Sequence, residues 1–108
     1  MRRRLVNAIL RQSLLEQASD VHFENDDGGC HLRFRISGAL QERTPPPQRM
    51  FDAIACHLKF LAKLDAAERR RPQGGRFSIK AQGRVLEVHV STSATAQGER
   101  VVLRLEPA

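Results

Sequence analysis

The chain has 108 residues, with 18 lysines and arginines against 12 aspartates and glutamates, so its formal net charge is +6 at pH 7. A chain of this length buries about two thirds of the surface that its unfolded form exposes, which predicts one domain over residues 1–108 and leaves no room for a second. No apolar run approaches the roughly 20 residues that a membrane-spanning helix needs, so we expect no transmembrane segment. Asn7 and Arg11 interrupt any apolar stretch of signal-peptide length, and we expect a cytoplasmic protein.

Cysteine and arginine usage add two expectations. Cys30 and Cys56 form no CxxC pair, which favours reduced, buried thiols over a disulfide. The basic residues are fifteen arginines and three lysines. The planar fork of arginine suits bidentate contact with phosphates or carboxylates, but a genome rich in G and C, which favours arginine codons, would explain the same count.

The first half of the chain predicts one helix followed by a three-stranded meander. Val6, Leu10 and Leu14 recur at helical spacing, which predicts a helix over residues 3–17. The period then changes to two, which predicts strands over about residues 20–43. The turns of these strands are expected at residues 25–29 and at residues 37–38.

Prolines 45–47 stop this sheet and suit the first turn of a second helix, predicted over residues 47–64 from an apolar stripe that includes Met50, Ile54, Leu58 and Leu61. Residues 65–75 predict a charged loop, and the glycines at 74 and 75 predict a tight turn. Three more strands are expected over about residues 76–105, with the small, polar segment 91–99 as a mobile connection. The predicted fold class is α+β, with about six mostly antiparallel strands and two main helices packed on one face.

Side-chain alternation assigns the polar residues of the strands to the sheet face away from the helices. Cations outnumber acids on this predicted face, where Glu24 and Glu87 are the main acids. Such a face attracts polyanions, but a solvated sheet face often carries the same residues. There is no tyrosine or tryptophan, and all five phenylalanines fall on core-facing or helical positions, so we expect no nucleic-acid partner. The cations on this face are His22, His31, Arg33, Arg35, Arg76, Lys80, His89 and Arg104.

Sequence motifs of catalysis and metal binding are absent. There is no glycine-rich loop followed by Lys-Ser/Thr, no GxSxG and no HExxH, so we expect no catalytic residue and no enzyme activity from this chain alone. The histidines and cysteines lack the spacing of zinc sites, so no metal is expected. Glu87 and His89 share one strand face, which predicts a surface ion pair and not a catalytic dyad.

Five blocks, in this order, resemble the domain that precedes the motor in type II secretion and type IV pilus assembly ATPases: LVNAILRQ at 5–12, ASDVHFE at 18–24, LRFRISG at 32–38, LDAAERRRPQ at 64–73 and GERVVLRL at 98–105. The resemblance implies a PAS-like module followed by a RecA-like motor, which residues 1–108 do not include. It also implies hexameric rings, with ATP and Mg²⁺ for the full-length protein and no cofactor in this chain. The expected partners are the motor, neighbouring subunits and platform proteins that hold the ATPase peripherally at the inner membrane.

In that family this domain closes over the nucleotide and directs arginines toward its phosphates. Arg76 matches the first of these arginines. His89 replaces the second, because residues 87–92 are EVHVST where the family usually has DVRVST. With Asn25, Ser37 and Gly74 as further departures, this implies a divergent relative. The contribution of its arginines to the nucleotide phosphates is then either weakened or regulated by the charge of His89 near neutral pH.

Three functions therefore stay open from the sequence. The first is a non-catalytic N-terminal domain of a secretion or pilus ATPase, which helps to form the ring and presents Arg76 to nucleotide. The second is a stand-alone PAS-like module that binds a ligand or phosphate without a motor. The third, a polyanion-binding protein, rests on charge alone.

Overall fold

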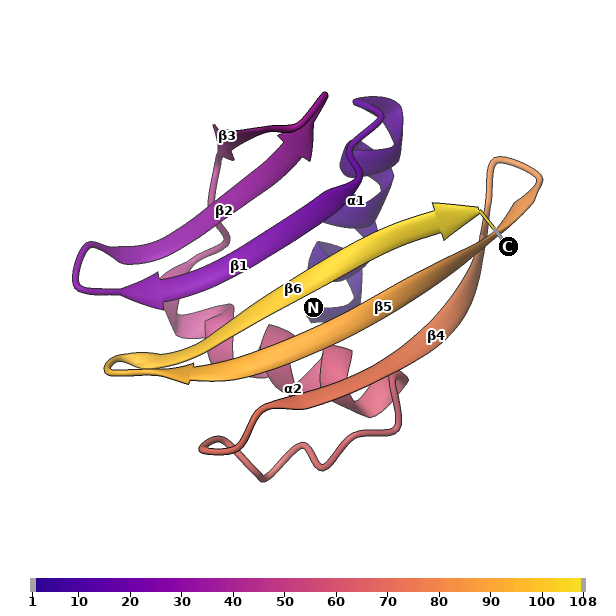
Figure 1. Ribbon diagram of the computed structural model, residues 1–108. Coiled ribbons are helices and arrows are strands. Elements are labelled where there is room, and N and C mark those ends of the chain that lie inside the picture. The colour runs from indigo at the N-terminus through magenta and orange to yellow at the C-terminus, as the bar shows by residue number, and fades with distance from the viewer. Residues whose placement is uncertain (1, 108) are drawn as a thin grey trace.

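Two helices cover one face of a six-stranded antiparallel sheet in the computed structural model, which describes residues 2–107 (Figure 1). Met1 and Ala108, the end residues of the predicted domain, lie outside the described residues. The strand order is β3-β2-β1-β6-β5-β4. The elements are α1 (Arg2–Leu15), β1 (Asp20–Asp26), β2 (Gly29–Ile36), β3 (Ala39–Arg43), the 3-10 turn η1 (Gln48–Met50), α2 (Phe51–Leu61), β4 (Gln73–Ala81), β5 (Arg84–Thr95) and β6 (Gly98–Pro107). The α+β architecture predicted from the sequence is confirmed.

The helices end at Leu15 and Leu61, before the predicted ends at residues 17 and 64, and they end in the same way. Gln17 and Lys63 adopt left-handed backbone angles, with φ of 58° and 59°. The next backbone N–H then returns to the last turn of the helix, from Ala18 to Ser13 O at 2.9 Å and from Leu64 to Lys59 O at 2.8 Å. These bonds satisfy carbonyl groups that a helix end leaves free. No helix within residues 2–107 is both long and apolar enough to cross a membrane.

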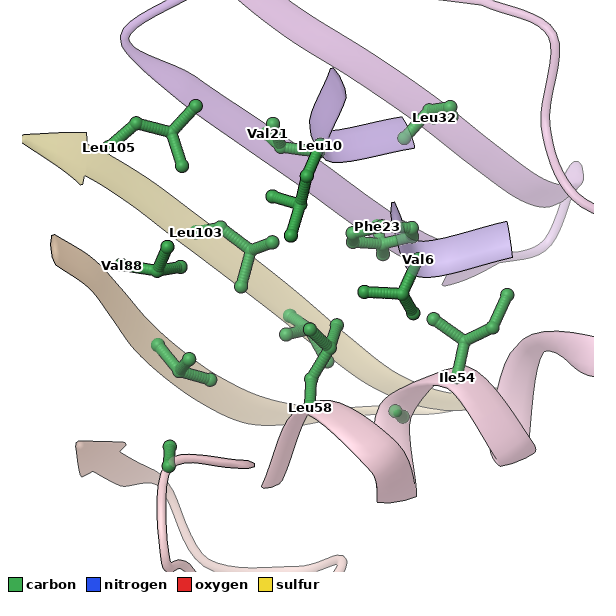
Figure 2. Packing of buried hydrophobic residues seen from close by; sticks show 14 of the residues in the cluster. Val6, Leu10, Val21, Phe23, Leu32, Ile54, Leu58, Val88, Leu103 and Leu105 are labelled. Atoms are coloured by element: carbon green, nitrogen blue, oxygen red, sulfur yellow. The ribbon is translucent and has the colours of Figure 1, made fainter. Parts of the chain in front are cut away.

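The apolar core lies between the helices and the sheet (Figure 2). Val6 and Leu10 of α1 and Ile54 and Leu58 of α2 face strand residues such as Phe23 across this layer. Full burial of an aromatic or aliphatic side chain of this size contributes about 1.5–3 kcal/mol each. Every strand residue that alternation assigns to the inner face is buried in this core or packs against it: Val21, Phe23, Leu32, Phe34, Ile36, Phe77, Ile79, Leu86, Val88, Val90, Val101, Leu103 and Leu105.

The tight turn predicted at Gly74 and Gly75 is wrong, because both glycines lie inside strand β4. β4 pairs with β5 from Gln73 onward, so Gly75 lies opposite Val90. A Cβ at Gly75 would lie 2.7 Å from Ala62 O and 2.9 Å from Leu64 Cδ2. Glycine is present here because the backbone after α2 passes directly against the strand.

The mobile connection predicted over residues 91–99 is also wrong. β5 continues to Thr95 and β6 begins at Gly98, so only two residues turn the chain. Asn25 holds this hairpin from the neighbouring strand, since its Nδ2 donates to Gln97 O at 3.1 Å and its carbonyl accepts from Thr95 Oγ1 at 2.7 Å. Small polar residues predict a loop, but here cross-strand hydrogen bonds order them.

The glycines of β4 give a direct test of this packing. We expect Gly75→Ala to lower the free energy of unfolding by about 1–3 kcal/mol, because the added methyl group overlaps a backbone carbonyl. Gly74→Ala is the matched control: its Cβ would meet nothing closer than Val90 O at 3.8 Å, so it should be neutral. Urea denaturation of the three proteins measures both. Equal losses for the two variants would contradict the close approach at Gly75.

Candidate functional site

The strand register brings the two predicted site residues together on the polar face of the sheet. Arg76 of β4 lies directly opposite His89 of β5, and Arg104 of β6 lies opposite His89 on its other side. Side chains directly opposite each other on antiparallel strands have Cβ atoms about 4.5–5.5 Å apart, within reach of one another. The row continues to Asp20 of β1 and Arg35 of β2.

Arg76 is held loosely at the edge of the sheet. Its side chain is 68% exposed, and its Nε lies 3.9 Å from Glu87 Oε1. Among the described residues the guanidinium donates no hydrogen bond to a side chain or carbonyl. A pair this long and exposed contributes little, so the fork of Arg76 is free to bind an incoming oxyanion.

His89 occupies a different environment in the middle of the row. Its Nε2 lies 3.6 Å from Glu106 Oε2 and 3.9 Å from Glu87 Oε2. This nitrogen is closed off from solvent and has no hydrogen-bond partner within residues 2–107. Beside it the surface forms a shallow hollow lined by His89, Ser91, Val102 and Arg104. The ion pair predicted between Glu87 and His89 is therefore long, and Glu106 competes for the same imidazole.

The polar face carries more negative charge than alternation alone predicted. Asp20, Glu42 and Glu106 join Glu24 and Glu87 there, and each lies within 4 Å of a cation. Burial lowers the pKa of His22, although the Glu24 carboxylate opposes this shift. Positive and negative side chains therefore lie next to one another across this face. Arg76 is the most exposed of the paired cations. The pairs are Glu24–His22, Asp26–His31, Glu24–Arg33, Glu42–Arg33, Asp20–Arg35, Glu87–Arg76, Glu87–His89, Glu106–His89 and Glu106–Arg104.

A buried ion pair lies under the start of β4, and the sequence analysis did not predict it. Lys59 of α2 is 0% exposed, and its Nζ lies 2.5 Å from Glu99 Oε2 of β6, which is 3% exposed. The same Nζ donates to Glu68 O at 2.6 Å. Arg69 reaches the second carboxylate oxygen of Glu99 at 3.6 Å, so both buried charges have several partners.

This pair orders the loop that leads to Arg76. Glu68 Oε1 accepts backbone hydrogen bonds from Arg70 and Arg71, and these bonds lower the pKa of Glu68. Gln73 closes the loop, since its Nε2 donates to Asp65 O at 2.9 Å and its Oε1 accepts from Asp65 N at 2.9 Å. The segment between α2 and β4 is therefore tied at both ends, three residues before Arg76.

Two patterns in the sequence could have revealed this pair. Lys59 is spaced four residues from Ala55 and eight from Phe51, so it falls on the buried stripe of α2. Glu99 alternates with Val101 and Leu103, so it falls on the inner face of β6. A charge of each sign on apolar faces that meet predicts a buried ion pair, because an isolated buried charge is too costly.

Neither metal ligands nor a disulfide is found in the part of the chain that the structure describes. No group of three or more His, Cys, Asp or Glu side chains there could hold a metal ion. Cys30 and Cys56 are free thiols, as the sequence predicts. Both are half-buried, whereas the sequence analysis predicts buried thiols. Burial raises the pKa of the Cys30 thiol, which disfavours its reactive form.

Comparison with known proteins gives a family that agrees with the resemblance of the five sequence blocks. A family model described as "Type II/IV secretion system protein" matches residues 1–107. The chain belongs to this family. Its relatives include the Type II secretion system protein E of Pseudomonas aeruginosa, 44% identical over 94% of this chain, and that of Klebsiella pneumoniae, 43% identical over 94%. The Type II secretion system ATPase E of Vibrio cholerae is 42% identical over 94%. The chain spans only 20% of the length of each of these relatives.

The buried Lys59–Glu99 pair of this secretion-family domain predicts a large loss of stability when one partner is removed. We expect Lys59→Met to lower the free energy of unfolding by about 3–5 kcal/mol, because Glu99 keeps its charge in an apolar surrounding. Lys63→Met is the control, since Lys63 is exposed four residues further along. Urea denaturation gives both values, and the double variant Lys59→Met/Glu99→Gln should recover part of the loss. A Lys59→Met protein as stable as Lys63→Met would contradict the pairing.

Proposed function

We propose that this chain is the non-catalytic N-terminal domain of a type II secretion or type IV pilus assembly ATPase. In this proposal it helps to form a hexameric ring and presents Arg76 to nucleotide phosphates held by a RecA-like motor. The observation that supports it is the position of Arg76 on an edge strand after an ordered loop, where its side chain is 68% exposed and only distantly paired with Glu87. Membership of the secretion family supports the assignment to a secretion or pilus ATPase.

The geometry suits an arginine that acts across a domain boundary. Arg76 stands on β4, which pairs with β5 alone and leaves its other edge open to an approaching domain. The loop that precedes β4 is held by Lys59, Glu99 and Gln73, so the backbone of Arg76 starts from a defined place. An arginine brought in by closure would neutralise charge on the phosphoryl group being transferred.

ATP and Mg²⁺ would be bound by the motor, where the metal would supply positive charge that neutralises the phosphates. This chain would contribute only side chains: Arg76 at the phosphates, with His89 beside it where the family usually has arginine. We also propose the PAS-like assignment of the architecture. The full-length protein would act in the cytoplasm, held peripherally at the inner membrane by platform proteins of its secretion or pilus system.

His89 would make this contribution dependent on pH. Two carboxylates, Glu87 and Glu106, attract a protonated imidazole at this position, whereas Arg76 and Arg104 from the adjacent strands oppose its charge. Histidine is the side chain that changes charge near neutral pH. In its charged form His89 would add a second cation next to Arg76, and in its neutral form it would leave Arg76 alone.

A chimera tests the role of Arg76. Residues of this chain replace the matching segment of the Pseudomonas aeruginosa relative, which aligns over 102 residues, and steady-state ATP turnover is measured. We expect Arg76→Ala to lower kcat by at least about tenfold, because arginines that stabilise phosphoryl transfer contribute more than this in other nucleotide hydrolases. Arg84→Ala is the matched control, an exposed arginine at the start of β5 in the same hairpin, and should stay within about twofold of the parent. Equal turnover of the two variants would refute the proposed role.

The same chimera tests His89. We expect His89→Arg to raise kcat more at pH 8 than at pH 6, because an arginine keeps its charge over this range whereas histidine side chains change charge near neutral pH. The measurement is the ratio of the two turnover numbers across the pH range, so pH effects on the motor cancel. A ratio that stays constant from pH 6 to pH 8 would show that His89 has no charge-dependent role.

A further inference from the structure

Phe60 is the most exposed large apolar residue of the described chain, at 72%. It lies on α2, whose opposite side supplies Ile54 and Leu58 to the core. α2 therefore carries one exposed aromatic ring on the side away from the core, and nothing within residues 2–107 covers it. An aromatic ring left in water costs free energy that its burial against a partner would recover.

The surroundings of Phe60 are positively charged. Together with Arg2 and Arg3 of α1 and His57 of α2, it lines a shallow hollow on the helical side of the molecule. Lys63 follows Phe60 by three residues in the sequence and lies just beyond the end of α2. Burial lowers the pKa of His57, and the charges of Arg2 and Arg3 lower it further, which reflects cations without a nearby carboxylate.

These cations lack the acidic partners that four arginines of the polar face have, and Lys80 and Arg100 of that face also form no ion pair within residues 2–107. Within residues 2–107, Arg2, Arg3 and Lys63 form no ion pair, whereas Arg33, Arg35, Arg76 and Arg104 each lie within 4 Å of an acid. The first turn of α1 also contains no acidic residue. Arginines at a helix N-terminus meet the positive end of its dipole, which costs about 0.3–1 kcal/mol each. An acidic partner would turn this repulsion into attraction.

A protein segment suits this surface better than a lipid bilayer does. Membrane binding grows with the apolar area buried, and Phe60 supplies a single ring here. Leu15, the other strongly exposed apolar residue of the helices, lies at the far end of α1 from Arg2 and Arg3. An isolated aromatic beside arginines, next to a hollow, is instead the composition typical of protein interfaces.

We propose that Phe60, Arg2, Arg3 and His57 form a docking surface for an acidic segment of another protein. An apolar side chain of that segment would contact the Phe60 ring, and its carboxylates would pair with Arg2 and Arg3. This surface is on the helices, on the opposite side of the sheet from Arg76, so it stands independently of the proposed nucleotide role.

Binding of a synthetic peptide to the intact chain tests the proposal. The probe is a fluorescein-labelled amphipathic helix of glutamate and leucine, with a lysine–leucine peptide of the same pattern as control. We expect saturable binding of the acidic peptide alone, weakened by salt. Phe60→Ser and Arg2→Gln/Arg3→Gln should each weaken it at least about tenfold. The matched controls Leu15→Ser and Arg84→Gln remove an exposed apolar side chain and an unpaired arginine elsewhere, and should change it less than about twofold.

NMR of the same complex locates the contact. Chemical shifts should change at Phe60 and His57, and bound carboxylates should raise the pKa of His57, opposing the effect of Arg2 and Arg3. Unchanged affinity of Phe60→Ser, or no saturable binding up to about millimolar peptide, would refute the proposal. Phe60-dependent binding to phosphatidylcholine vesicles with about one third phosphatidylglycerol, tighter than to the peptide, would replace the protein partner with a lipid surface.

Discussion

The buried contact between Lys59 and Glu99 is the interaction on which the arrangement of this domain depends. It joins α2 to the β5–β6 hairpin, and through Glu68 O it also holds the loop between α2 and β4. Two charges out of water are stabilising only when each has close partners, and here the partners come from α2, β6 and the loop between α2 and β4. The pair therefore specifies how helix, hairpin and loop fit together, more than it adds to total stability.

The position of Arg76 follows from that contact. Because the loop is tied to Lys59 and Gly75 lies against the backbone after α2, β4 is seated on the edge of the sheet in one register. The strand pairing then sets Arg76 next to His89 and Arg104. Arg76 is held through its backbone while its guanidinium stays open, which is what a group acting on a ligand outside its own domain requires.

The two sides of the molecule use positive charge differently. On the sheet face each arginine of the central row is near a carboxylate, so the net charge of +6 is not concentrated there. On the helical side, Arg2 and Arg3 in the N-terminal turn of α1 lie beside the exposed Phe60 without an acidic partner among residues 2–107. Charge that is balanced within the domain supports register and solubility, whereas unbalanced charge beside an apolar ring favours an external partner.

The sequence by itself determined the fold class, the inner face of the sheet and the family, because hydrophobic alternation, helical spacing and five ordered blocks are local patterns. It also placed Arg76 and His89 on one face. Only the tertiary structure decided that Gly75 lies in a strand packed closely against another backbone segment and not in a turn. It also decided that residues 91–99 form a hairpin and that Lys59 is buried. Each of these depends on a group distant in the chain: Ala62 O, Asn25 and Glu99. Whether a polar residue is exposed or paired depends on what packs opposite it, and that is set by the assembled sheet and helices.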